Sequence, residues 1–364
     1  MQRSSLAPRS QRLALRRGIA VAFTAAALSV AANAQEQAST FAGSDTVTVH
    51  REGERSIRYT GRIQEILGES VILGRNNINK TEVFRLSDVT ELTFVRPEAF
   101  DKGLLLRSTK NYDQAIKQFD VAIKNEHRPW AKNEMLAAAA GTCVTMGNYN
   151  AAVGRIQKIV ETDLRSRHAS LLPLVWDERL SSKESASAEI KDLRHASVVR
   201  RLVAASVLLA DKDTQRAAEQ TLSNLRKEAP PRIAELAVAQ LWRIPLLTDS
   251  EDFSLKLPTW YRQLKQLPLE ARGGPQHVIG RCLQRQHDYD RASIAFLWLP
   301  FMSPTDEALA ARSMLEGIRC LRESGRIDEA ETLRLELLRR FPKTSSATAI
   351  ANHKLPTAAD AKTE

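Results

Sequence analysis

The chain has 364 residues, of which 43% are hydrophobic and 26% charged, and its formal net charge is +10. That length holds one large domain or two to three ordinary ones, and the apolar share is enough for a packed core. The first 34 residues carry five arginines and no acid, so the remainder holds only +10 − 5 = +5. A mild, scattered excess of this kind argues against a nucleic-acid binder, which concentrates its charge in a patch or stripe.

The N-terminus has the pattern of an export signal. A basic segment, Met1–Arg17, precedes an apolar run, Gly18–Val30, and Ala32-Asn33-Ala34 fits a small-x-small cleavage site. We predict a Sec-type signal peptide over residues 1–34, cleaved after Ala34, and a periplasmic or secreted bacterial protein. An uncleaved membrane anchor is the alternative. No later segment has the ~20 apolar residues of a spanning helix, so no membrane span is expected once the signal is removed.

A small β module is expected after a polar linker at residues 35–44, because the hydrophobic period changes to two over residues 45–96. The predicted strands are Thr46–Val49, Ser56–Ile66, Ser70–Leu73, Thr81–Leu86 and Thr90–Val95. Short strands in so few residues favour a strongly bent, partly closed barrel. The phrase from Gly61 to Leu73 resembles the central strands of SH3-like or Sm-like barrels. The module is expected either to bind peptide or to cap the first helix.

Helical periodicity begins at residue 97. The segment Lys110–Phe119 (KNYDQAIKQF) places a tyrosine, an alanine and a phenylalanine on one helix face. The same phrase returns at Gly147–Ile156, His287–Phe296 and Gly325–Arg334. We predict a first helix at Glu98–Ser108, with Gly103 in its middle, and a second at Tyr112–Asn125. The spacing of Gly103 and the phrase resembles the tetratricopeptide repeat. The resemblance implies an α-solenoid of helical hairpins over residues 97–343, in which the glycine lets two helices touch.

The remaining segments are less regular. Residues 164–273 are expected to hold degenerate helical pairs that continue the solenoid, with a separate helical domain as the alternative. Among them are an apolar stretch at Leu193–Ala210 and helices at Gln215–Lys227, capped by Asp213 or Thr214, and Arg232–Arg243. Residues 344–364 lack periodicity and are predicted to form a disordered tail.

The three cysteines, Cys143, Cys282 and Cys320, make an odd, low count that excludes a disulfide framework. Each falls in the first helix of a predicted repeat, where cysteine acts as a small buried hydrophobe. A bridge between Cys282 and Cys320 is the alternative.

No motif for catalysis, nucleotide binding or zinc binding is present, and the seven histidines are scattered along the chain. We therefore predict a non-enzymatic protein without a cofactor or a metal. The expected function is an exported scaffold or adaptor for protein–protein interaction. A structural, oligomer-forming component of a cell-envelope assembly is the alternative.

A basic stripe offers the sharpest functional hint. Its members lie at helical spacing in the first helices of two neighbouring predicted repeats: His277, Arg281 and Arg285, then Arg312, Arg319 and Arg322. In tetratricopeptide arrays this stripe tends to face a concave groove that binds extended peptides. Arginines there clamp carboxylates through paired hydrogen bonds. The resemblance thus implies a peptide-binding groove for an acidic or C-terminal segment of a protein partner, with an ordinary solvated face as the alternative.

Overall fold

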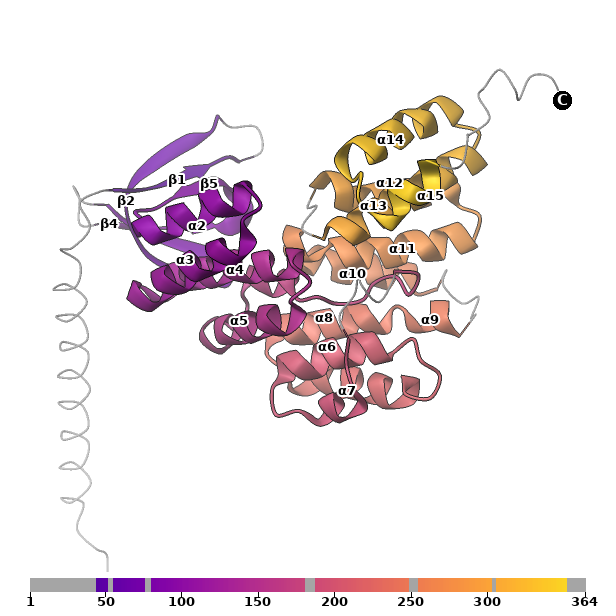
Figure 1. Ribbon diagram of the computed structural model, residues 1–364, viewed down its shortest axis with the longest axis horizontal. Coiled ribbons are helices and arrows are strands. Elements are labelled where there is room, and N and C mark those ends of the chain that lie inside the picture. The colour runs from indigo at the N-terminus through magenta and orange to yellow at the C-terminus, as the bar shows by residue number, and fades with distance from the viewer. Residues whose placement is uncertain are drawn as a thin grey trace, which may run out of the picture.

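The computed structural model describes residues 44–51, 55–75, 80–180, 187–248, 255–302 and 306–351. The predicted signal peptide at 1–34, most of the linker and the end of the predicted tail lie outside these residues. The described chain is mainly helical, with a small five-stranded antiparallel sheet at its N-terminal end (Figure 1). Within the described ranges, no helix combines the length and apolar character needed to cross a bilayer.

The sheet has the strand order β4-β3-β2-β1-β5. Its strands are β1 (Asp45–Val49), β2 (Ile57–Leu67), β3 (Ser70–Arg75), β4 (Lys80–Arg85) and β5 (Val89–Thr93), with a short 3-10 turn, η2 (Leu86–Asp88), before the last. All neighbours pair antiparallel, and the long strand β2 shifts register between Ile63 and Glu65. The predicted strands are therefore confirmed to within two residues at every end.

The sheet packs on the helices that follow it. Its buried core includes Val47 and Val71 and is completed by Trp130, which α4 (Pro129–Thr145) contributes. The Gly68 amide in the β2–β3 turn donates to both carboxylate oxygens of Asp163 at 3.1 Å. An apolar core shared with a helix, together with this buried hydrogen bond, holds the sheet against the helical part.

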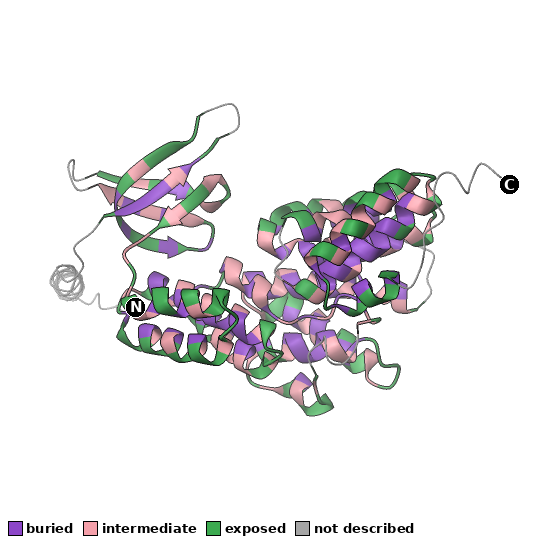
Figure 2. Ribbon diagram, turned by 45° about the horizontal axis from the view of Figure 1, so that its top comes forward, coloured by how far each residue is buried: buried purple, intermediate pink, exposed green. Residues whose placement is uncertain are grey.

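At the repeated phrase, the described chain forms four helical hairpins. In each, the second helix begins within the phrase, where the sequence predicts it. The hairpins are α2 (Glu98–Ser108) with α3 (Tyr112–Asn125), α4 (Pro129–Thr145) with α5 (Tyr149–Thr162), α11 (Gly273–Arg285) with α12 (Tyr289–Met302), and α13 (Glu307–Glu323) with α14 (Ile327–Arg340). The predicted helices at 98–108 and 112–125 are confirmed at both ends. Buried residues follow the contacts between neighbouring helices, and exposed residues cover the outer faces (Figure 2).

All four hairpin turns share one backbone conformation. The residue that opens each phrase has a positive φ: 63° at Lys110, 73° at Gly147, 59° at His287 and 78° at Gly325. In each turn the next amide donates to the carbonyl five residues earlier, at 2.8 to 3.0 Å. This hydrogen bond and the left-handed residue are the marks of a Schellman motif, which satisfies carbonyls at a helix C-terminus.

Two hairpins also share a close helix approach. A Cβ on Gly103 of α2 would lie 2.6 Å from the ring of Phe119 on α3. A Cβ on Gly280 of α11 would lie 2.9 Å from the ring of Phe296 on α12. The predicted role of Gly103, to let two helices touch, is confirmed because only a residue without a Cβ leaves room for the aromatic ring.

The middle of the chain is less regular. It contains η3 (Arg167–Leu171), η4 (Ile190–Arg194), α6 (Val198–Leu208), α7 (Gln215–Glu228), α8 (Pro231–Leu241), α9 (Ile244–Leu247), α10 (Leu257–Gln266) and η5 (Leu269–Ala271). The stretch predicted as one apolar run from Leu193 is broken before α6, where Ser197 caps the new helix. Thr214 does hold the N-cap position of α7, but its hydroxyl donates to the Leu208 carbonyl at 2.7 Å.

The predicted disorder does not begin at residue 344. Residues Ser345–Ala351 form α15, where Ala347 and Ile350 are buried. These two apolar side chains are three residues apart, so they share one face of the short helix, and Ile350 joins the main core. The three cysteines are buried and free, as predicted from their positions in first helices.

Candidate functional site

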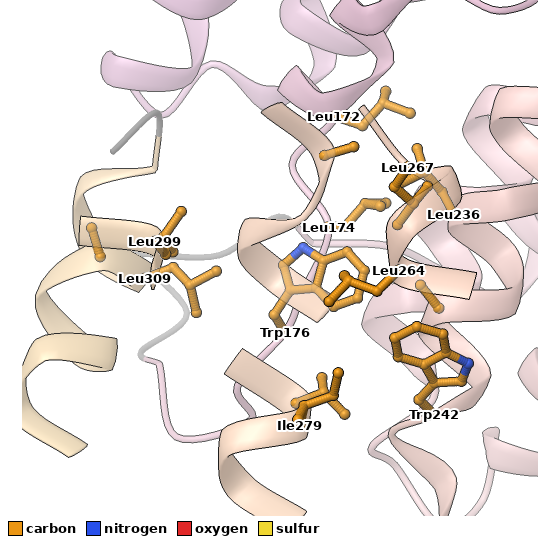
Figure 3. Packing of buried hydrophobic residues seen from close by; sticks show 14 of the residues in the cluster. Leu172, Leu174, Trp176, Leu236, Trp242, Leu264, Leu267, Ile279, Leu299 and Leu309 are labelled. Carbon is orange, nitrogen blue, oxygen red and sulfur yellow. The ribbon is translucent and has the colours of Figure 1, made fainter. Parts of the chain in front are cut away.

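An extended segment crosses between helices that are distant in the sequence. We call residues 172–180 the crossing segment; they follow η3 and include no helix or strand. Figure 3 shows Leu174 and Trp176 between the leucines of α12 and α13 on one side and Leu236 and Leu264 on the other. The crossing segment thus lies within the main hydrophobic core, which includes both labelled residues.

Side chains of other helices satisfy the backbone of the crossing segment. The Val175 amide donates to Ser206 Oγ of α6 at 2.7 Å, and the Val175 carbonyl accepts from Gln240 Nε2 of α8 at 3.2 Å. The indole of Trp176 packs on Gly274 of α11, where any Cβ would overlap the ring. Irregular backbone is tolerated in a core only when its polar groups find such partners.

Asp177 is the centre of a buried charge cluster. Its carboxylate has no exposed area and contacts His277 Nε2 at 3.0 Å, Arg281 Nη1 at 3.3 Å and Arg312 Nε at 3.3 Å. Arg179 Nη2 adds a contact at 2.6 Å. Burial by itself raises the pKa of Asp177, but the hydrogen bonds and charges of His277 and Arg179 outweigh it and hold the pKa far below its usual range. Asp177 is therefore ionised at all ordinary pH values.

A second carboxylate, Glu316 of α13, extends the cluster. Its side chain is 1% exposed and pairs with Arg179 at 3.1 Å, Arg312 at 3.2 Å and Arg319 at 2.9 Å. Gln284 of α11 donates to it at 3.1 Å. Desolvation opposes ionisation here too, yet the charges of Arg179, Arg312 and Arg319 lower the pKa of Glu316.

The structure brings together four of the six residues of the predicted stripe. His277, Arg281 and Arg312 meet at Asp177, and Arg319 binds Glu316 while remaining 48% exposed. Among the described residues, no ion pair joins the other two to Asp177 or Glu316. Arg285 donates to the Leu246 carbonyl at 2.9 Å. Arg322 has a buried Nε without a hydrogen-bond partner among the described atoms.

Sequence reasoning missed the acidic half of the site, Asp177 and Glu316, together with Arg179. A signal was present for each. Trp176 is followed directly by three charged residues after an apolar run, and Glu316 sits between Arg312 and Arg319 at helical spacing. The structure therefore places the chain's own carboxylates against the stripe, and binding of a partner's carboxylate there stays a prediction.

A serine also joins the cluster. Ser313 Oγ lies 2.7 Å from His277 Nδ1, whose other ring nitrogen faces Asp177. The Ser–His–Asp order is that of a nucleophilic triad. Here, however, Ser313 and His277 have no exposed area. In this conformation no substrate reaches the hydroxyl, and the serine fixes the orientation of the imidazole.

A cavity of about 540 Å³ runs beside the crossing segment. Leu172, Leu174 and Trp176 line one part of it, and Gly274 and Leu309 line another.

Among the described residues, no group of three or more His, Cys, Asp or Glu side chains is placed to hold a metal ion. Comparison with protein-family models, with curated proteins and with solved structures finds no match to this chain.

Proposed function

We propose that the protein is an exported, non-enzymatic scaffold that holds protein partners on a tetratricopeptide-like α-solenoid. The observation that carries the proposal is that three residues of the basic stripe, His277, Arg281 and Arg312, contact the Asp177 carboxylate. An extended acidic segment is the ligand expected for such a stripe.

Two features of the hairpins support the solenoid. The four turns use one motif at equivalent positions. In two hairpins a glycine meets a phenylalanine at the same separation, since 119 − 103 = 16 and 296 − 280 = 16. Repeats of one packing unit bury a continuous core only by stacking.

For the β module, the strand order and the register shift in β2 support the barrel resemblance. Its contact with Trp130 favours a capping role.

Export is tested separately from binding. Cell fractionation and N-terminal sequencing of the natural protein are expected to find it in the envelope or outside the cell, starting at Gln35. A protein that keeps Met1 and fractionates with the cytoplasm would exclude the export signal and leave the binding proposal unaffected.

Binding is tested with a matched pair of variants. Arg319→Glu changes an exposed arginine of the stripe that pairs with a glutamate three residues earlier, and Arg339→Glu changes the same kind of pair on α14. Each mature variant is used to capture partners from an envelope fraction. We expect a specific partner to be lost with Arg319→Glu and kept with Arg339→Glu. Equal capture by both variants would reject the stripe as the binding surface.

A structural, oligomer-forming role is the second candidate, and one surface favours it. Ile294, Phe301 and Met302 of α12 are 69%, 50% and 61% exposed. Apolar side chains grouped on one exposed helix are typical of protein contacts. Light scattering at several concentrations is expected to show a defined oligomer if α12 is an interface, and Ile294→Glu is expected to return it to the monomer. A monomeric wild-type chain at every concentration would remove this candidate.

A further inference from the structure

We propose that the crossing segment is an internal ligand of the surface formed by α11 and α13. The surface then recognises an extended segment in which a large aromatic residue precedes an aspartate, and a partner segment of that chemistry competes with residues 172–180. The inference deepens the proposed scaffold function and rests on it for the existence of such a partner.

The crossing segment is held as a bound peptide is held. Its main chain forms no ladder; Ser206 and Gln240 bind the Val175 amide and carbonyl instead. Its side chains then reach separate subsites: the indole of Trp176 lies on Gly274, and the carboxylate of Asp177 lies among cationic side chains of α11 and α13. Backbone contacts for affinity and side-chain subsites for specificity are the two elements of peptide recognition.

Charge makes the surface selective. Without the crossing segment, three arginines of α11 and α13 (Arg281, Arg312 and Arg319) remain near one carboxylate, Glu316, an excess of 3 − 1 = +2 charges. Arg281 and Arg312 are only 15% and 14% exposed. Without Asp177, Arg281 loses its carboxylate partner and Arg312 must share Glu316 with Arg319. Burying cations with too few anions is strongly unfavourable. A segment that replaces the crossing segment must therefore supply a carboxylate of its own, so a neutral segment is rejected.

The neighbouring cavity gives a partner access to the crossing segment. Leu172, Leu174 and Trp176 contribute to the wall of this 540 Å³ space, opposite Leu309 of α13. An incoming aromatic side chain can occupy the cavity before Trp176 leaves Gly274.

The test removes the two anchoring side chains of the crossing segment and adds the natural segment back as a separate peptide. In the mature chain, Trp176→Ala with Asp177→Ala removes both anchors, and the probe is a fluorescent peptide of residues 170–180 (SLLPLVWDERL). We expect the double variant to bind the peptide with micromolar affinity and the wild-type chain to bind it at least ten-fold more weakly. A peptide carrying Asp177→Asn should bind the double variant at least ten-fold more weakly than the natural peptide.

Each outcome decides the proposal. A folded double variant that ignores the peptide, or that binds the Asp and Asn peptides equally, overturns it. If the double variant does not fold alone, co-refolding with the natural peptide should restore its circular dichroism spectrum, and failure of the peptide to restore it also overturns the proposal. Peptide binding without any captured envelope partner would uphold the internal ligand while rejecting the scaffold function.

Discussion

Lys110 offers a direct test of the repeated turn. It is exposed and holds a φ of 63° at the position where two of the other three hairpins have glycine. A left-handed backbone costs an L-residue ~1–2 kcal/mol, and glycine in the unfolded chain has extra entropy that removes ~0.4–1 kcal/mol of stability. We expect Lys110→Gly to raise the free energy of unfolding by the difference, roughly 0.5–1 kcal/mol.

The reverse change is available in the same molecule. Gly147 and Gly325 have φ of 73° and 78°, and no described atom beyond the glycine and its two chain neighbours lies within 4 Å of a Cβ added to either. Gly147→Ala and Gly325→Ala should therefore lower the free energy of unfolding by about the same amount, through the backbone alone. Lys110→Ala keeps a Cβ in the same conformation and serves as the neutral control.

Urea unfolding of the mature chain, followed by circular dichroism, measures all four variants. The transition midpoint is expected to rise for Lys110→Gly and to fall for both alanine variants at an unchanged slope. Lys110→Gly that destabilises the chain, with harmless alanine at Gly147, would refute the shared left-handed turn.

Three further results follow from burial and charge. Gly103→Ala should destabilise the first hairpin by ~1–3 kcal/mol in urea unfolding, because the new Cβ would lie 2.6 Å from the Phe119 ring. The half-buried Glu134 pairs with His168 and Arg167. Burial raises its pKa, but the charges and hydrogen bonds of these two partners outweigh burial and lower the pKa to about 2. Because this pKa lies below the ordinary 4.5, the stability that Glu134 contributes is complete above pH 4.5 and is lost as pH falls toward 2. Glu134→Gln should therefore make the free energy of unfolding depend less on pH between these two values, as measured by urea unfolding at several pH values. Burial raises the pKa of Cys282 and Cys320 to about 12, so neither thiol should react with a disulfide reagent at pH ~8 until urea unfolds the chain.

The parts of the fold that the sequence predicts are those that depend on near neighbours. Strands at residues 45–93 and the helices from Glu98 to Asn125 follow from alternation, spacing and turn residues, and all are confirmed. The start of α15 was missed because Ser345–Ala351 is rich in small and polar residues, and its helix forms by packing Ile350 on the core. A contact with distant residues overrides a weak local preference.

Sequence reasoning predicted the basic half of the candidate site and missed the acidic half, again because only near neighbours leave a pattern in the sequence. The stripe on α11 and α13 has helical spacing, so His277, Arg281 and Arg312 could be grouped without a structure. Asp177 lies 100 to 135 residues before these partners. No local pattern reports a separation of that size, since it depends on the irregular helices between residues 187 and 273.

The charge cluster joins the irregular crossing segment to the regular helices α11 and α13, and this has a physical consequence. Buried ion pairs add little net stability over apolar packing, but loss of one partner is costly because the other charge remains buried. Asp177 therefore makes few alternatives tolerable: any arrangement that moves the crossing segment away leaves Arg281 without Asp177, and leaves Arg312 and Arg319 to share Glu316. Regular hairpins can stack in many registers through small and large side chains alone. We expect the Asp177 carboxylate to favour the arrangement in which it meets His277, Arg281 and Arg312, and only a segment that brings the same charge can replace it.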